Sequence, residues 1–406
     1  MRAFAEEWDW KRISCNMLVM NISTMQSTES LLVRRFDRAP TRIEVLLIVT
    51  ILAGCGDRSD ILPQSRATAQ PLLKQALSKE CSAADASSAF QADAVTAVKA
   101  VPQTRRFRFN YAFTFSGLEE GKHVRIWMPV PPTNSFQQVQ RLQTQLPAEA
   151  SLHADSDYGN QILYLQTRVP ESGRLAIDVP YRVQRTEVFA GHDRSSAGAA
   201  KALSEDDRRL FLRSNALVPI AGKPLELLRQ IDLRLDPLKL ARQLYDVVDR
   251  HVTYKKDGAG WGEGNVLWVC DSRFGNCTDF HSLFISLARS QRLPAKFEIG
   301  FSIPADAPEG AVAGYHCWAW FFRNGRGWIP VDISEADKYP QLKDYYFGNL
   351  SEDRVLFSVG RDIHLLPPQS GPPLNFFIYP YAEIEGKPVT QKQLKVRFIY
   401  KDMAES

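Results

Sequence analysis

The chain has 406 residues, of which 44% are hydrophobic and 24% charged, a composition typical of globular proteins and unlike that of disordered or collagen-like chains. Fifty basic residues nearly balance 46 acidic ones, so the net charge of +4 gives no indication of a nucleic acid partner. At about 150 residues per domain, this length suggests two or three domains. Six cysteines are too few for a small protein held together by disulfides.

The longest apolar run lies near the amino terminus, at residues 45–53. As a helix it would rise only about 14 Å, less than half of a ~30 Å hydrocarbon core, so it is too short for a permanent membrane span. Its length suits the hydrophobic region of a signal peptide, and four arginines between positions 34 and 42 supply the positive flank. Residues 1–54 are therefore predicted to be a signal-peptide region, with Met25 as a candidate for the true start.

The apolar run ends in Leu52-Ala53-Gly54-Cys55, and small residues before a cysteine resemble a bacterial lipobox. Cleavage there would leave Cys55 as the first residue, with lipid on its sulfur. The sequence thus predicts a periplasmic lipoprotein of the bacterial cell envelope, anchored to a membrane through Cys55. The alternative is a buried apolar strand that ends in Gly-Cys.

The predicted mature chain divides into segments that differ in composition and in the spacing of their apolar residues. Residues 55–104 are rich in Ala, Ser and Gln and predict a tether. From Arg105 aromatic residues occupy every second position, which is the period of a half-buried strand. Several such runs separated by turn residues predict a β-sandwich domain over residues 105–188. A helical period follows, with a capping serine at Ser204 and a second helix at about residues 237–251.

A helix with a cysteine at its start is the first element that carries chemistry. After Gly275-Asn276-Cys277, apolar residues fall at i, i+3, i+4 and i+7 from Phe280, as in a buried helix. Free backbone N–H groups and the helix dipole at this end favour a thiolate and stabilise an oxyanion. A lone buried cysteine is more often structural, but the position of Cys277 favours a nucleophile.

A predicted hairpin supplies a base and a carboxylate. Residues 314–322 and 328–333 predict two strands, and a two-residue loop between them would send His316 and Asp332 to opposite faces. A three-residue loop at 323–325 sets His316 opposite Asp332, within reach of a hydrogen bond. We predict the three-residue loop, and with it an imidazole that Asp332 orients toward a cysteine nucleophile.

The three segments 275–284 (GNCTDFHSLF), 314–318 (GYHCW) and 327–336 (GWIPVDISEA) resemble the bacterial transglutaminase-like proteins, which belong to the papain-like superfamily of Cys-His-Asp enzymes. The resemblance implies that Cys277 is the nucleophile, His316 the base and Asp332 the orienting carboxylate. It implies an α+β fold in which the cysteine helix packs on an antiparallel sheet over residues 205–345, after the β-sandwich. The strands of residues 346–406 are expected to complete this core.

The chemistry of that family implies a thioester acyl-enzyme formed from an amide of a protein or peptide. An amine acceptor then gives cross-linking, and water gives deamidation or proteolysis. No cofactor is expected, and the cysteines and histidines lack the paired short spacings of a metal site. The alternative function is a non-catalytic lipoprotein in which the same fold is a binding or scaffold module. The oligomeric state stays open.

Other polar residues near the motifs have less specific interpretations. His281, one helical turn after Cys277, is the rival base, but a supporting role is favoured because no carboxylate is evident to orient it. Asp279 is expected to compensate the helix dipole. Cys317 follows His316 on a strand and is expected to face away from the site.

Two further questions remain open from the sequence. Cys270 and Cys277 could form a disulfide in an oxidising periplasm, but nothing in the sequence brings their Cα atoms together. A second oxyanion donor is unassigned. Trp261 and Trp268 are indole candidates, although tryptophans are more often packing residues.

Overall fold

The computed structural model describes residues 101–146, 149–189 and 202–404. The predicted signal-peptide region, the lipid-attachment site Cys55 and most of the tether lie outside the described residues. All described residues belong to the unit Thr68–Ser406. Within the described ranges, no helix combines the length and the apolar character needed to cross a membrane.

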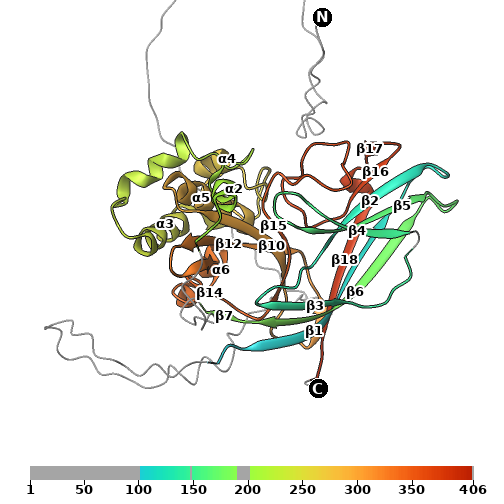
Figure 1. Cartoon of the computed structure of the whole chain (residues 1–406), viewed down its shortest axis with the longest axis horizontal. Coiled ribbons are helices and arrows are strands. Elements are labelled where there is room, and N and C mark those ends of the chain that lie inside the picture. Colours follow the sequence, from blue (N-terminus) through green and yellow to red (C-terminus); the bar gives the residue numbers. More distant parts are fainter. Residues whose placement is uncertain (1–100, 147–148, 190–201, 405–406) are drawn as a thin grey trace, which may run out of the picture. The chain divides into compact units, whose positions relative to one another are not determined.

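Two antiparallel five-stranded sheets form the β-sandwich (Figure 1). One has the order β11 (Glu309–Ala311), β18 (Leu394–Asp402), β1 (Thr104–Phe115), β6 (Leu175–Thr186) and β3 (Gln137–Arg141). The other has the order β17 (Lys387–Pro388), β16 (Tyr381–Ile384), β2 (His123–Val130), β5 (Gln161–Arg168) and β4 (Ala150–Ala154). The alternating aromatic residues of β1 are buried, as the two-residue period predicts, and the rings of Phe109 and Tyr111 pack against Phe398 of β18 and against rings of the four-stranded core sheet.

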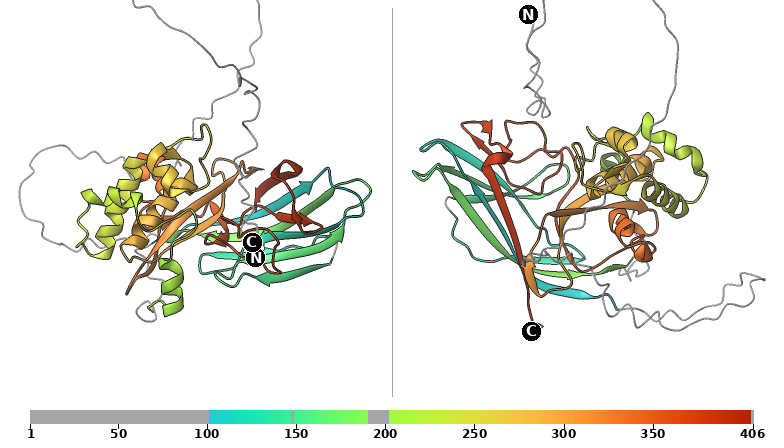
Figure 2. Two further views of the ribbon diagram at one scale, coloured as in Figure 1. Left: turned by 90° about the horizontal axis from the view of Figure 1, so that it is seen from above. Right: turned by 180° about the vertical axis from the view of Figure 1, so that it is seen from behind.

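The second part is a four-stranded antiparallel sheet covered by helices (Figures 1 and 2). Its strand order is β13 (Gly327–Val331), β12 (Tyr315–Arg323), β10 (Ala295–Ser302) and β15 (Arg354–Val359). The helices are α2 (Glu205–Leu212), α3 (Pro237–His251), α4 (Val266–Ser272), α5 (Cys277–Ser290) and α6 (Ile333–Lys338). Helix α5 packs on β10 and β12, and α3 packs on α5. This mixed α/β arrangement is the fold class that the sequence predicted.

Short elements connect these parts. Two two-stranded pairs join β7 (Val188–Phe189) to β14 (Asn349–Leu350) and β8 (Thr253–Tyr254) to β9 (Phe274–Gly275). Three 3₁₀ helices occupy Lys223–Gln230, Pro340–Leu342 and Gln391–Gln393. The β8–β9 pair is parallel and lies directly before α5, so it helps to fix the point at which that helix begins.

The carboxyl-terminal segment 346–406 does not complete the core as a whole, and this part of the expectation was wrong. Of its described strands, β15 joins the core sheet, whereas β16 pairs with β2 and β18 pairs with β1. Phe398 and Tyr400 of β18 are buried among the aromatic residues of the sandwich. An alternating strand fits either sheet, so the pattern of β18 could not show which sheet it joins.

The hairpin between β12 and β13 has the predicted loop length in a different register. Arg323 pairs with Gly327, so the loop contains residues 324–326 instead of 323–325. The pairing is thereby shifted by two residues, which keeps the parity of the two strands and leaves His316 and Asp332 on one face. The last ladder partner is Val331, opposite Ala319, and Asp332 follows it as the N-cap of α6. Gly325 has φ of +79°, the left-handed conformation that such a loop requires.

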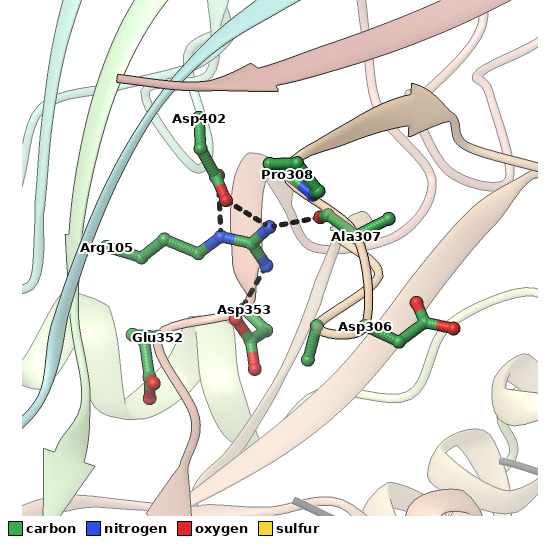
Figure 3. A pocket seen from close by; sticks show the side chains of 8 residues that line it. Arg105, Asp306, Ala307, Pro308, Glu352, Asp353 and Asp402 are labelled. Atoms are coloured by element: carbon green, nitrogen blue, oxygen red, sulfur yellow. Dashed lines mark hydrogen bonds and ion pairs between the residues drawn. The ribbon is translucent and has the colours of Figure 1, made fainter. Parts of the chain in front are cut away.

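Arg105 of the sandwich connects the sandwich to the core through hydrogen bonds (Figure 3). Arg105 of β1 donates hydrogen bonds to Asp353 at 2.8 Å and to Asp402 at 2.9 Å, and to the carbonyl of Pro304 at 2.9 Å. Arg105, Asp353 and Asp402 line a pocket of about 330 Å³ together with Glu352 and residues 305–308. Because Asp353 directly precedes β15, this contact fixes the start of that strand.

Candidate active site

Cys277 is the first residue of α5, and its position is fixed by a capping box. The Asn276 side chain accepts a hydrogen bond from the Thr278 N–H at 2.8 Å, and the Asp279 carboxylate accepts one from the Asn276 N–H at 2.8 Å. Cys277 itself is only 2% exposed. The thiol therefore lies at the positive end of the helix dipole, where the Thr278 and Asp279 N–H groups donate to Asn276 and the Cys277 N–H is the remaining candidate donor to an oxyanion.

Asp279 does more than compensate the helix dipole. Its carboxylate also accepts hydrogen bonds from the N–H groups of Gly262 and Gly264, at 2.6 and 3.0 Å, and so ties the glycine-rich loop to the start of α5. A Cβ at Gly275 would lie 2.3 Å from an Asp279 oxygen, which explains the glycine two residues before the cysteine. Burial raises the pKa of Asp279 to about 6 against the opposing effect of the three backbone hydrogen bonds.

His316 and Asp332 are in contact, as the sequence predicted. His316 Nε2 lies 2.7 Å from Asp332 Oδ2, and the two residues are 5% and 0% exposed. Burial alone would lower the pKa of His316, but the charge and hydrogen bond of Asp332 and the interaction with Cys277 raise it to about 10. Burial likewise opposes ionisation of Asp332, yet His316 and Arg354 hold its pKa well below the ordinary value.

The pKa of the Cys277 thiol is shifted in the opposite direction from that of an ordinary buried cysteine. Burial by itself raises its pKa, but hydrogen bonds from Cys317 and His316 and the charge of His316 lower the pKa well below the usual 9.0. Because His316 Nε2 is bonded to Asp332, Nδ1 is the ring nitrogen left for Cys277. The arrangement favours a thiolate–imidazolium pair held by a buried carboxylate.

Cys317 faces the helix that carries Cys277, and the expectation that it points away was wrong. Its Sγ lies 3.7 Å from Thr278 Oγ1 and 3.8 Å from His281 Nδ1. The alternation of β12 holds, but α5 packs on the Cys317 face of the strand. Both faces of the first residues of β12 therefore contribute to the site.

His281 has no ring nitrogen left for the thiol. Its Nδ1 lies 2.7 Å from the Cys277 carbonyl oxygen, to which it donates, and its Nε2 accepts a hydrogen bond from the Ile333 N–H at 3.0 Å. Burial lowers its pKa, which agrees with a neutral ring. His281 thus connects the first turn of α5 to the backbone directly after Asp332.

Two residues of the site were not singled out from the sequence. The Tyr315 hydroxyl accepts hydrogen bonds from Asn276 Nδ2 at 2.9 Å and from Thr278 Oγ1 at 3.1 Å. The Arg354 guanidinium, 2% exposed, lies 3.1 Å from Asp332 Oδ2. Tyr315 adjoins the histidine motif and could have been found there, whereas no local pattern marks Arg354.

The remaining candidates of the sequence have other surroundings. Cys270, Cys277 and Cys317 are all unpaired thiols. The Trp268 ring packs on Phe274 and against Gly260, where a Cβ would lie 2.6 Å from the indole nitrogen. Among the residues that the structure describes, no three His, Cys, Asp or Glu side chains form a metal-binding group.

Comparison with known proteins finds a family model that matches the segment carrying these residues. Residues 226–333, a span that includes Cys277, His316 and Asp332, match the model of the transglutaminase-like superfamily. An uncharacterized protein of Haemophilus influenzae is 30% identical over 203 residues, which are 41% of this chain and 55% of that protein, so the chain spans about half the length of this relative.

A solved structure shows a similar fold. A crystal structure described as that of a candidate cysteine protease from Cytophaga hutchinsonii covers 75% of this chain and 92% of its own, with 15% identity and a TM-score of 0.50. The periplasmic domain of TgpA from Pseudomonas aeruginosa covers 60% of this chain and 94% of its own, with 16% identity and a TM-score of 0.30. At this identity the first of these likenesses concerns the fold alone.

Proposed function

The chain contains a transglutaminase-like domain, and on that premise we propose that it is a cysteine enzyme acting on amide bonds of a protein or peptide. Cys277 is the nucleophile, His316 the base and acid, and Asp332 the residue that orients His316. The observation that carries the proposal is the chain of buried contacts from Asp332 through the His316 ring to a cysteine at the start of α5.

The proposed reaction follows from these contacts. The Cys277 thiolate attacks the amide carbonyl carbon, and the Cys277 N–H at the start of α5 stabilises the oxyanion. His316, protonated in the resting pair, gives its proton to the leaving nitrogen, and the C–N bond breaks to leave a thioester on Cys277. His316 then takes a proton from an incoming amine or water, which attacks the thioester and restores the thiolate.

The acceptor decides the product. An amine gives a cross-link, and water gives deamidation of a glutamine side chain or cleavage of a peptide bond. The half-buried rings of Tyr254, Tyr315 and Tyr379 lie near the start of α5. The Tyr315 hydroxyl binds Asn276 and Thr278, the Tyr254 ring packs on Phe280, and the Tyr379 ring packs on Tyr315. Such partly exposed aromatic surface supports a peptide segment as substrate.

A direct test compares matched cysteine variants of the full chain. A primary-amine probe and a glutamine-rich protein are incubated with the protein, and amine incorporation, ammonia release and new amino termini are measured. Wild type and Cys270→Ala are expected to be active in at least one assay, because Cys270 is a half-buried thiol outside the site, whereas Cys277→Ala is inactive. Equal activity of wild type and Cys277→Ala would contradict the proposal.

The non-catalytic alternative gives a different result. A binding or scaffold module would be inert in all three assays, and its Cys277 would react with iodoacetamide no faster than Cys270. The pKa of Cys270 is raised to about 11, first of all by burial, so this thiol is a slow internal reference.

We further propose that lipid on Cys55 tethers the enzyme to a membrane of the bacterial cell envelope, on its periplasmic side. The apolar run 45–53, its arginine flank and the Leu-Ala-Gly-Cys sequence support this proposal. Intact-mass analysis of protein purified from membranes is expected to show a chain that begins at Cys55 and carries acyl groups. A soluble chain that retains residues 1–54 would contradict it.

A further inference from the structure

Arg354 is a buried cation that shares an oxygen atom with His316. Its Nη1 lies 3.1 Å from Asp332 Oδ2, the same atom that lies 2.7 Å from His316 Nε2. Its Nε donates to the Ser351 carbonyl at 3.2 Å, and its guanidinium carbon lies 4.9 Å from the centre of the Trp318 ring. Arg354 is thus fixed from three sides with its charge directed at Asp332.

The strand that carries Arg354 is held by the sandwich. Asp353, the residue before it, binds Arg105 of β1, and Arg105 in turn binds Asp402 of β18 (Figure 3). Arg354 also lies outside the segment 226–333 that matches the family model. The site therefore depends on a residue that the folding of the carboxyl-terminal segment brings to it.

Asp332 loses one of its two cationic neighbours during the proposed reaction. When His316 gives its proton to the leaving nitrogen, the ring becomes neutral and Asp332, which is 0% exposed, loses the cation that pairs with it. An unpaired carboxylate at such a buried position is strongly disfavoured and would draw the proton back to His316. An arginine does not release its proton in proteins, so Arg354 remains a cation next to Asp332 in both states.

We propose that Arg354 is a positioning residue of the proposed reaction, which keeps Asp332 paired and ionised in both protonation states of His316 and so allows His316 to release its proton to the leaving group. This inference rests on the proposed function for its role in turnover. Its effect on His316 is a property of the site that can be measured without turnover.

The first measurement is the titration of His316 by NMR of ¹³C-histidine-labelled full chain. It is made in a Cys277→Ala background, since removal of the thiolate removes one cause of the raised pKa of His316. Arg354→Met is expected to raise the pKa of His316 by roughly one unit, because Asp332 then has His316 as its main cation. Arg354→Gln, a neutral residue that retains a donor, is expected to shift it in the same direction, and Arg354→Lys much less.

The second measurement separates proton donation from nucleophile activation, with Cys277 present. For Arg354→Met, alkylation of Cys277 at pH 7 is expected to stay within about threefold of wild type, while amide turnover falls roughly tenfold for each unit of the His316 shift. The guanidinium ion is expected to restore part of the turnover of Arg354→Ala.

A matched control is Arg289→Met. Arg289 is also a buried arginine of the core, 3% exposed, but it binds Asn215 and the Ala295 carbonyl and does not touch Asp332. This variant is expected to lose stability without any change in the titration of His316.

Several outcomes would overturn the inference. A folded Arg354→Met or Arg354→Gln protein in which the pKa of His316 is unchanged or lower than in wild type would do so, as would equal losses of alkylation and turnover. If the Met variant does not fold, the Gln variant decides in the same way. Should wild type show no amide turnover at all, the proposed function fails, and the titration of His316 still tests the effect of Arg354.

Discussion

Asp353 and Arg354 are consecutive residues that belong to two different clusters of arginine and aspartate. The two clusters differ in what else they contact. Arg354 and Asp332 are 3% and 0% exposed at their side chains and share their charges with His316. Arg105, Asp353 and Asp402 are 12%, 13% and 35% exposed, and Arg105 is bound by both carboxylates and by backbone carbonyls. No cysteine or histidine lines the pocket of the second cluster.

The difference shows that an open pocket with charged walls is not by itself a site of chemistry. The Arg105 cluster has its charges paired with one another, so it holds two parts of the chain together. The Asp332 cluster contains a carboxylate, an imidazole and a thiol whose pKa values are all displaced, which is the usual sign of a functional site.

The largest effect is expected for Asp332→Asn. The amide cannot stabilise the imidazolium of His316, so turnover is expected to fall by about 10⁴-fold. The change also leaves the Arg354 charge buried without its carboxylate, at an expected cost of about 3–5 kcal/mol in the free energy of unfolding. Single-turnover kinetics and chemical denaturation measure the two effects, and an Asn variant with near-wild-type turnover would remove Asp332 from the mechanism.

An intermediate effect is expected at Cys317, whose thiol donates a hydrogen bond to Cys277. Cys317→Ala removes this donor, so the apparent pKa for alkylation of Cys277 is expected to rise by roughly one unit and its reaction rate on the acidic limb to fall about tenfold. Cys317→Ser retains a donor and serves as the control. An alanine variant with the wild-type profile would show that Cys317 only fills space.

A smaller effect concerns stability and pH at Asp279. Its pKa is raised from 3.8 to about 6 in the folded state, so the folded chain binds more protons than the unfolded chain between these values. The contribution of Asp279 is therefore present below pH 4 and is lost as the pH rises through about 6, by roughly 2 kcal/mol. The fall in unfolding free energy from pH 4 to 6 is expected to be smaller by this amount in Asp279→Asn. Parallel curves of unfolding free energy against pH for wild type and Asp279→Asn would refute this prediction.

The smallest effect is expected for Asp402→Asn in the Arg105 cluster. Asp402 is 35% exposed and Arg105 keeps its bond to Asp353, so the loss in unfolding free energy is expected to be about 1 kcal/mol or less. Amide turnover and the titration of His316 are expected to stay at wild-type values. A large loss of turnover in this variant would mean that the two clusters are one functional unit.

The sequence predicted those parts of the site that depend on local patterns. The apolar stripe that follows Cys277 predicted a buried helix at this position, and α5 begins at Cys277 with every residue up to Arg289 buried. The odd length of the hairpin loop predicted that His316 and Asp332 share a face, and they are in contact. A shift of two residues in the register left both residues on the same face, because successive residues of a strand alternate between its two faces.

The parts that the sequence did not predict depend on contacts between distant segments. Arg354 reaches Asp332 across 22 residues, from a strand whose place beside β10 no local period encodes. Cys317 was assigned to the wrong side because the packing of α5 against β12 is a tertiary feature. The same holds for β18, whose alternating residues suit either sheet.

The thiolate–imidazolium pair of Cys277 and His316 is tested most directly by the rate of Cys277 alkylation between pH 5 and 10, measured by mass spectrometry with Cys270 as the reference in the same molecule. The thiolate–imidazolium pair predicts that Cys277 is already fully reactive at pH 6 and that its rate changes little up to pH 9, while Cys270 becomes reactive only as the pH approaches its raised pKa. A Cys277 rate that rises about tenfold per pH unit up to pH 8.5, as for an ordinary thiol, would contradict the account.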